Sequence, residues 1–505
     1  MVADSTETQP PRVSGRLGSK KTKTGCFTCR QVKSSNSEAG VAHDCAENIG
    51  CTRLNLHCAG YQDVFRASGL SRERAAIPAH KPSQSAASLE RQLSLFHGSD
   101  DERRLFEYFR KRVVFQLGGF LDEDFWITTL LQASHSESLI RYSVIAIAAY
   151  IGESNRHFRA TVPIPQQSYN AALKYYQNAL FRANRRTESA DPELVAILSC
   201  PLFLCMEFLQ GKKLQAMSLF LHGHFLMQSI SQHSATSGWA TVNQSLRPMY
   251  NRLMMMAKLF GHNLTLPSSS NPTLSTFNSL KEARDILFRH LVVMHEFLKV
   301  LNSTTCPPEH YLLRQKELLI QLDTWNCNFR EMCGSLDGPD HAVIATLITW
   351  HAAAVIWLRN PSEGFEMSFD ESLDYFQVIV EKANEALASK QHILDDDFTF
   401  EMGVLPPLYF TALKCRHFSL RKEALRLLAK GPRREGLWDR EELLTVASRA
   451  ISLETAAQSD ITSLPPEPER LRKVKIFQQD GGHELKAVFI YRDRKIEQVW
   501  NQIAR

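Results

Sequence analysis

The sequence predicts an all-α protein: a large multi-helix domain follows a small cysteine-rich N-terminal segment, and a short β element is expected at the C-terminus. Apolar residues recur at helical spacing from residue 99 onward, and strand signals are nearly absent before the last residues. The 505 residues are 44% hydrophobic and 22% charged, which is ordinary for a chain that buries a large core. This composition excludes collagen-like, mostly disordered and small disulfide-scaffold proteins.

Residues 1–25 are expected to form a disordered basic arm, because they lack periodic apolar positions. Seven basic residues and no acidic residue lie between Arg12 and Lys33. Residues 1–100 carry a surplus of four positive charges, whereas the other 405 residues carry a surplus of one. A cationic arm on a nearly neutral body indicates either a polyanion-binding end or a solvated tail. Because Met1–Pro11 is polar and acidic, a secretory signal is not expected.

A cluster of cysteines follows the arm. Five of the 11 cysteines lie within residues 26–58, namely Cys26, Cys29, Cys45, Cys51 and Cys58. Without a secretory signal, metal binding explains this cluster better than disulfides, and thiolates suit zinc. The segment has few large apolar residues, so its folding has to come from metal ligation. The remaining cysteines are expected to be small buried side chains: Cys200, Cys205, Cys306, Cys327, Cys333 and Cys415.

Residues 59–98 are rich in alanine, serine and proline and are expected to form a linker to the helical domain at 99–505. The S-x-x-E spacing of a capping box occurs at Ser99–Glu102 and at Ser134–Glu137, which predicts two helix starts. The second is followed by apolar residues at helical spacing, which are Ile140, Val144, Ile147, Ala148 and Ile151.

Further helices are expected along the rest of the domain. The apolar pattern predicts them at about 168–185, 192–210, 212–232, 245–260, 276–302, 308–330, 340–359, 368–389, 405–429 and 440–457. Near the end, KAVFIYRDRKIEQVW is expected to form a strand or a hairpin. Helix after helix joined by short polar loops predicts an all-α domain, and no fixed-period repeat of the solenoid kind is found.

One stretch is apolar enough to raise the question of a membrane span. Residues 342–358, AVIATLITWHAAAVIWL, are 17 residues long, and a spanning helix needs about 20. His351 lies near its centre, and Arg359 follows it. The better interpretation is a central helix packed on all sides, without a membrane partner.

The N-terminal segment resembles the fungal binuclear zinc cluster, a six-cysteine DNA-binding module. KTKTGCFTCR carries Cys26 and Cys29 with a basic lead-in, and CTRLNLHCAGY carries Cys51 and Cys58 with the family's x6 spacing. The family pattern is C-x2-C-x6-C, a loop, then C-x2-C-x6-C. The resemblance implies that thiolates hold two zinc ions and that the basic residues after the second cysteine enter the major groove of DNA.

The middle of the segment departs from this pattern. Asn36 and Asn48 stand where cysteines are expected, and Cys45 lies at x5 from Cys51. His43 offers a sixth zinc ligand, since neutral imidazole binds zinc. Three interpretations stay open: a working variant cluster, a degenerate module that no longer reads DNA, or a stretch at 31–50 that is translated intron rather than part of the mature protein.

The helical body resembles the fungal-specific transcription factor domain, an all-helical regulatory region. LFEYFRKRVVFQLGGFLDEDFWITTLLQASHSESLIRYSVIAIAAY at 105–150 is similar to its opening, and GLWDREELLTVASRAISLE at 436–454 to its closing motif. The large apolar residues of the opening block are expected to be core residues: Phe125, Trp126, Leu130, Leu131 and Val144.

Catalytic signatures are missing from the sequence, so no enzyme is expected. There is no phosphate-binding G-x-x-x-x-G-K-[ST], no G-x-G-x-x-G after a strand, no H-E-x-x-H and no G-x-S-x-G. His222 and His224 have H-x-H spacing, but on a helix they point about 200° apart. One of them is therefore expected on the surface and the other in the core.

The resemblance implies a nuclear, sequence-specific DNA-binding regulator of transcription, of a kind that often controls a biosynthetic, frequently secondary-metabolite, gene set. The five clustered cysteines ligate zinc in this hypothesis, and its partners are double-stranded DNA, a second copy of the chain and the transcription machinery or co-regulators. The alternative is a helical interaction protein whose zinc module no longer binds DNA. The expected DNA contacts are phosphates for Lys20, Lys21 and Lys23 and base edges for Arg30 or Lys33.

Overall fold

Helices make up most of the structure, a computed structural model. It describes residues 98–118, 121–122, 124–160, 169–184, 191–230, 242–262, 276–303, 309–334, 336, 340–361, 365–390, 398–456, 458, 460, 463–478 and 484–501. The chain divides into two units, Met1–Gln92 and Leu93–Arg505. The first unit lies outside the described residues, and with it lie the predicted arm, the cysteine-rich segment and most of the linker.

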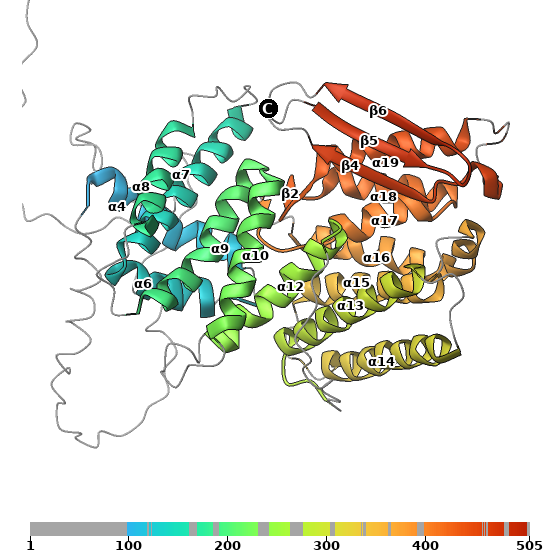
Figure 1. The fold of residues 1–505 in the computed structure, drawn as a ribbon, viewed down its shortest axis with the longest axis horizontal. Helices are drawn as coiled ribbons and strands as arrows, with labels where there is room; N and C mark the ends of the chain where they lie inside the picture. The colour runs from blue at the N-terminus through green and yellow to red at the C-terminus, as the bar shows by residue number, and fades with distance from the viewer. Residues whose placement is uncertain are drawn as a thin grey trace, which may run out of the picture. The chain divides into compact units, whose positions relative to one another are not determined.

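The second unit carries the predicted helical domain (Figure 1). Its first half contains α4 Asp100–Tyr108, η2 Phe109–Val113, α5 Val114–Gly118, η3 Asp124–Thr129, α6 Leu130–Ser136, α7 Ser138–Ala160, α8 Asn170–Asn184, α9 Pro192–Gln210, α10 Lys213–Ile230, η5 Val242–Leu246 and α12 Arg247–Leu259. Its second half contains α13 Leu280–Ser303, α14 Glu309–Gly334, α15 His341–Arg359, η6 Glu366–Ser372, α16 Leu373–Lys390, α17 Leu405–Lys414, α18 Phe418–Lys430, α19 Arg440–Thr455 and η7 Glu467–Glu469. The label η marks short π-helices (η2, η3 and η5) and 3₁₀-helices (η6 and η7). The predicted all-α class is confirmed.

Of the two predicted capping boxes, one is present. The Ser99 hydroxyl accepts a hydrogen bond from the backbone N–H of Glu102, and the Glu102 carboxylate accepts one from the backbone N–H of Ser99, so α4 begins as expected. The second prediction is wrong, because Ser134 lies inside α6 and its hydroxyl donates to the Leu131 carbonyl. The next helix, α7, begins at Ser138 instead.

The first hydrophobic core surrounds α7. This helix packs against α4, α6, α8 and α9, and every residue of its predicted apolar stripe is buried. The opening block supplies further core residues, since Phe125, Trp126 and Leu130 are fully buried, whereas Leu131 is half-buried. Trp126 stacks edge to face on Phe400, which comes from the far end of the chain, with ring centroids 5.3 Å apart.

Helices α10 and α12 approach each other closely at a glycine. A Cβ atom at Gly223 of α10 would lie 2.1 Å from the hydroxyl oxygen of Tyr250 in α12. Only glycine therefore fits at this crossing without displacing the buried tyrosine ring.

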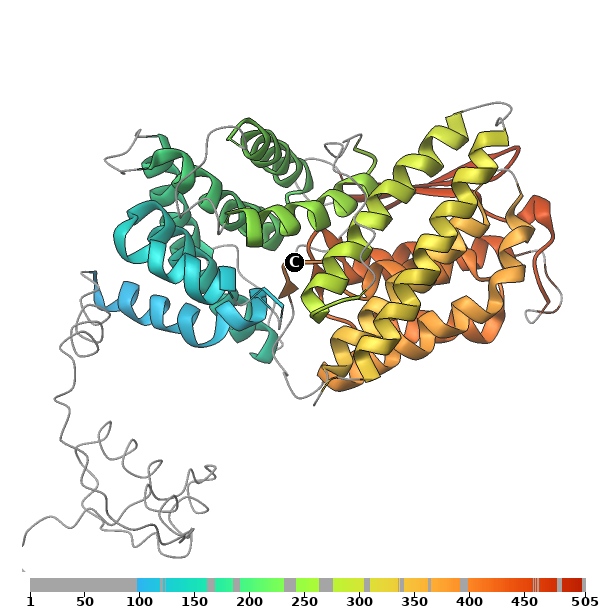
Figure 2. The ribbon, with the colours of Figure 1, turned by 90° about the horizontal axis from the view of Figure 1, so that it is seen from below.

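Two helices, α9 and α15, are long and apolar enough to cross a membrane, and 67% of the most apolar window of each is buried within the protein. Helix α15 packs against α13, α14 and α16, and these helices lie side by side in Figure 2. Its central His351 donates from Nε2 to the Leu322 carbonyl at 3.2 Å, and burial lowers the pKa of the imidazole to about 4. The structure thus places this stretch as the packed central helix that its sequence predicts.

The second core lies between α16–α19 and a C-terminal antiparallel sheet of order β4-β5-β6 (Figure 1). The strands are β4 Lys473–Gln478, β5 Glu484–Ile490 and β6 Lys495–Asn501. The predicted C-terminal β element is confirmed as the β5–β6 hairpin, while β4 was not predicted. Leu485, Ala487 and Phe489 of β5 are buried, and this strand contacts α19.

A second, very small sheet joins distant parts of the chain. Its strands are β1 Phe398–Thr399, β2 Arg434–Glu435 and β3 Trp438–Asp439, and Gly436 adopts a φ of 56° in the tight turn between β2 and β3. The buried carboxylate of Glu435 accepts hydrogen bonds from the first N–H groups of α17, and Asp439 caps α19. Both helices are therefore anchored at their N-termini by this turn.

The helix predicted over 405–429 is in fact two helices, α17 and α18. Cys415 and His417 have extended ψ angles of 120° and 118°, so the chain leaves the helical conformation between Lys414 and Phe418. The side chain of Arg416, within this break, is fully buried.

Candidate functional site

All ten residues predicted to bind zinc or DNA lie outside the described residues. These are Cys26, Cys29, Cys45, Cys51 and Cys58 as zinc ligands, and Lys20, Lys21, Lys23, Arg30 and Lys33 as DNA contacts. Their roles stay predictions, and so does that of His43.

Within the part of the chain that the structure describes, no group of three or more His, Cys, Asp or Glu side chains is arranged to hold a metal ion. His222 is exposed and His224 is buried, as the helical spacing predicts. Among the scattered cysteines, Cys205 and Cys415 are buried, whereas Cys200 and Cys333 are half-buried. The prediction is wrong for Cys327, which is exposed on α14, and Cys306 lies outside the described residues.

A set of charged side chains meets inside the second half of the domain, where α17, α18 and α19 converge. We name it the Arg416 cluster, and its members are Glu366, Lys414, Arg416, Arg421 and Glu454. Arg416 donates from Nη2 to Glu366 at 2.9 Å and to Glu454 at 3.0 Å. Lys414 donates to Glu366 at 2.7 Å. These bonds hold the extended break between α17 and α18 against two other elements, η6 and α19.

Glu454 is the central carboxylate of this cluster. Besides Arg416, it accepts hydrogen bonds from Arg421 and from the backbone N–H of Leu471, the latter at 2.7 Å. Its side chain is fully buried. Glu454 therefore ties α18, α19 and the segment that leads into β4 to one point.

The Arg416 cluster holds three cationic groups and two carboxylates. Burial opposes the ionisation of Glu454, but Arg416 and Arg421 outweigh it and hold the pKa of this carboxyl below its ordinary value. Burial lowers the pKa of Lys414 and the pKa of Arg421, although their carboxylate neighbours oppose this shift. One positive charge in the protein interior thus has no carboxylate within the cluster, which is unfavourable unless other groups stabilise it.

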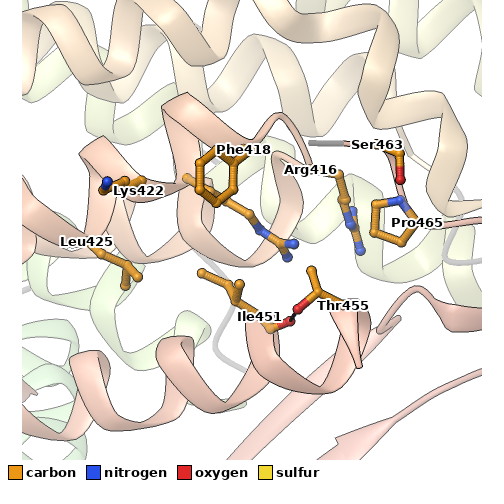
Figure 3. A pocket seen from close by; sticks show the side chains of 9 residues that line it. Arg416, Phe418, Lys422, Leu425, Ile451, Thr455, Ser463 and Pro465 are labelled. Atoms are coloured by element: carbon orange, nitrogen blue, oxygen red, sulfur yellow. Dashed lines mark hydrogen bonds between the residues drawn. The ribbon is translucent and has the colours of Figure 1, made fainter. Parts of the chain in front are cut away.

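A cavity of about 140 Å³ opens beside this cluster, between α18 and α19 (Figure 3). Its apolar walls come from Phe418, Leu425, Ile451 and Pro465, and both arginines of the cluster also line it. The remaining lining residues are Lys422, Thr455 and Ser463. Ligand pockets in proteins combine apolar walls with a few convergent polar groups, and this hollow has both features at a smaller volume.

A second buried set of charges links the two halves of the domain. We name it the Asp122 cluster, and its members are Asp122, Arg252, Arg284, Asp285 and Glu401. Asp122 accepts hydrogen bonds from Arg252 at 2.9 Å and from both terminal nitrogens of Arg284 at 2.8 and 2.9 Å. These arginines outweigh the effect of burial and lower the pKa of Asp122 to about 2. This cluster joins α12, α13 and the segment after β1.

Sequence reasoning missed both clusters, although a signal for the Arg416 cluster exists. In α18, Arg421 shares the buried face with Ala424 and Leu428, and in α19, Glu454 shares it with Ala447 and Ala450. A charged residue on the apolar stripe of a helix indicates a buried ion pair, because such residues are almost never fully buried without a partner.

Comparison with known proteins links part of the chain to a regulator of transcription. The "Aspercryptin biosynthesis cluster-specific transcription regulator atnN" of Emericella nidulans is 32% identical over 83 residues. The match covers 15% of this chain and spans 14% of the length of that relative. No protein-family model matches the chain, and no solved structure matches it.

Proposed function

We propose that this protein is a nuclear, sequence-specific DNA-binding regulator that controls transcription of a biosynthetic gene set. The observation that carries the proposal is the pair of cysteine motifs behind a basic arm, with Cys26 and Cys29 at x2 spacing and Cys51 and Cys58 at x6 spacing. The similarity of part of the chain to a cluster-specific transcription regulator supports the same function. No catalytic activity is expected of such a protein.

In this proposal the cysteine cluster holds zinc and thereby folds the segment at 26–58. Structural zinc contributes roughly 10–16 kcal/mol of binding free energy in finger peptides at neutral pH, which is enough to order a segment with few apolar residues. Lys20, Lys21 and Lys23 contact phosphates, and Arg30 or Lys33 reaches base edges. The helical domain serves regulation, partner binding or dimerisation.

The first test is the zinc content of the full chain, purified under reducing conditions and measured by atomic emission. About two zinc ions per chain are expected for a binuclear cluster of thiolate ligands. Cys26→Ser should lower the zinc content, whereas Cys327→Ser, on the exposed face of α14, should leave it unchanged. A metal-free protein would contradict the zinc part of the proposal and favour the interaction-protein alternative.

The second test is a salt titration of DNA binding by the full chain. The logarithm of the binding constant should fall with the logarithm of salt concentration by about 0.9 per phosphate neutralised. Replacing Lys20, Lys21 and Lys23 by alanine should weaken binding to every sequence alike, whereas Arg30→Ala should reduce the preference for the specific site. A protein that binds zinc but finds no specific site at any salt concentration would contradict the DNA-binding part.

The alternative function, a helical interaction protein with an inactive zinc module, is favoured by Asn36 and Asn48 in place of cysteines. Sequencing the transcript across codons 30–50 shows whether the protein itself lacks the family's cysteine spacing or whether the gene model is faulty. If the transcript joins Arg30 to a stretch with the usual cysteine spacing, the six-ligand cluster is restored.

A further inference from the structure

The cavity beside the Arg416 cluster has unused hydrogen-bond donors on its charged side. Nε of Arg416 is buried without a hydrogen-bond partner among the described residues. Arg421 donates from Nε to the Ala412 carbonyl at 2.9 Å and from Nη2 to Glu454 and the Leu413 carbonyl, but its Nη1 has no partner among these residues. Both arginines are at least nine-tenths buried, and of the two free donors Nε of Arg416 is the one buried from water without a partner.

The charge on this side of the cavity is positive for two independent reasons. The Arg416 cluster contains three cationic groups for two carboxylates, as shown above. The first turn of α18, which supplies Phe418 and Arg421 to the lining, carries no acidic residue and no side-chain cap. The N-terminus of a helix carries a partial positive charge and free N–H groups, so it adds to the attraction for an anion.

The rest of the cavity lining offers apolar contact. Phe418, Leu425, Ile451 and Pro465 form its walls, and the hydroxyl of Thr455 is already used as a donor to the Ile451 carbonyl at 2.9 Å (Figure 3). A dry apolar cavity of about 150 Å³ is large enough to hold benzene. The volume here, about 140 Å³, therefore fits a single ring or a short branched chain.

We propose that this cavity binds a small monocarboxylate with an aromatic or branched aliphatic body. The carboxylate pairs with the free guanidinium N–H groups of Arg416 and Arg421, a geometry in which arginine binds carboxylates strongly. The apolar body of the ligand occupies the hollow between α18 and α19. The bound anion neutralises the excess positive charge of the cluster. The site is independent of the proposed zinc and DNA functions and goes beyond them.

The test is calorimetric titration of the full-length protein with sodium benzoate, with benzamide and with inorganic phosphate. Benzoate should bind once per chain, benzamide at least tenfold more weakly because it lacks the charge, and phosphate not measurably because it lacks an apolar body. Ile451→Phe and Leu425→Phe fill the cavity from its two helices and should each weaken benzoate binding at least tenfold. Ile320→Phe, on the exposed face of α14, is the matched control and should bind as the wild type does.

Each contrary result overturns a defined part of the proposal. Absence of benzoate binding at millimolar concentration overturns the site itself. Equal binding of benzoate and benzamide overturns the role of the arginines, and comparable phosphate binding overturns the role of the apolar walls. Unchanged benzoate affinity in both cavity-filling variants overturns the location. Circular dichroism of each variant shows that it is folded, and two variants from different helices keep the test decisive if one of them fails to fold.

Discussion

The Asp122 cluster links the two halves of the helical domain, whereas the Arg416 cluster lies within the second half, and the two clusters differ in how their excess charge is placed. In the Asp122 cluster, three carboxylates surround two arginines, and the surplus negative charge lies on Asp285 and Glu401, which are 15% and 22% exposed. In the Arg416 cluster the surplus is positive, and the side chains of Lys414, Arg416 and Arg421 are 16%, 0% and 4% exposed. Both carboxylates that carry the surplus of the first cluster thus reach water, whereas two of the three cations of the second cluster, its arginines, are kept inside.

This difference distinguishes the Asp122 cluster, which is a purely structural ion network, from the Arg416 cluster, which is suited to bind an anionic ligand. A charge shared with solvent is stabilised by hydration and needs no further partner. A charge kept inside depends on the groups around it, and a cavity beside it provides room for a counter-ion. Removing single members of each cluster tests whether this distinction is real.

The largest effect is expected from Glu454→Gln. This substitution removes the carboxylate that faces Arg416 and Arg421, and it leaves three cationic groups for one carboxylate. Breaking a buried pair in this way costs about 3–5 kcal/mol of the free energy of unfolding. Urea unfolding followed by circular dichroism measures it, and a loss below about 1 kcal/mol would show that the cluster is better hydrated than its burial indicates.

A smaller loss is expected from Asp122→Asn. The amide keeps the size of the side chain but loses the charge that faces Arg252 and Arg284. Because Asp285 and Glu401 still neutralise Arg252, we expect a loss of roughly 2–3 kcal/mol in the same urea experiment. A loss as large as that of Glu454→Gln would contradict the difference between the two clusters.

The contribution of Asp122 should also disappear in acid. Its pKa is about 2 in the folded protein and about 4 in an unfolded chain, so its stabilising effect is complete above pH 4 and is lost as the pH falls toward 2. The shift corresponds to roughly 2 kcal/mol. The stability difference between the wild type and Asp122→Asn should therefore narrow over this range in urea titrations, and a constant difference would contradict the depressed pKa.

The smallest effect is expected from Glu317→Gln, which serves as the surface reference for both clusters. Glu317 pairs with Arg314 at 2.9 Å along α14, where the two side chains are 59% and 36% exposed. Exposed pairs of this kind contribute about 0–0.5 kcal/mol. A larger loss of unfolding free energy in the same measurement would mean that this pair on α14 contributes more to stability than its exposed side chains indicate.

The helices could be predicted because their signal is local. The stripe of α7, with Ile140, Val144 and Ile151, repeats at helical spacing, and burial follows that spacing. The same locality explains the error at Ser134, where the capping spacing is present but α6 continues through it to Ser136. Packing decides whether a polar residue ends one helix or begins the next, and the local sequence pattern does not contain that packing.

The break at Arg416 could not be predicted, because its cause lies far away in the chain. The pattern over 405–429 is continuous, and the partners that hold Arg416 outside a helix, Glu366 and Glu454, are 50 and 38 residues distant. The cavity likewise combines α18, α19 and the segment at 463–465. Strand β4 was missed for a similar reason, since its residues form a strand by pairing with β5.

The hydrogen bond from the Leu471 amide to Glu454 makes the last three strands part of the support of the helical domain. Leu485, Ala487 and Phe489 also complete the second core. A chain shortened after α19 would therefore lose one donor to a buried carboxylate and expose an apolar face of several helices. Truncated versions made for crystallisation should keep every residue through β6.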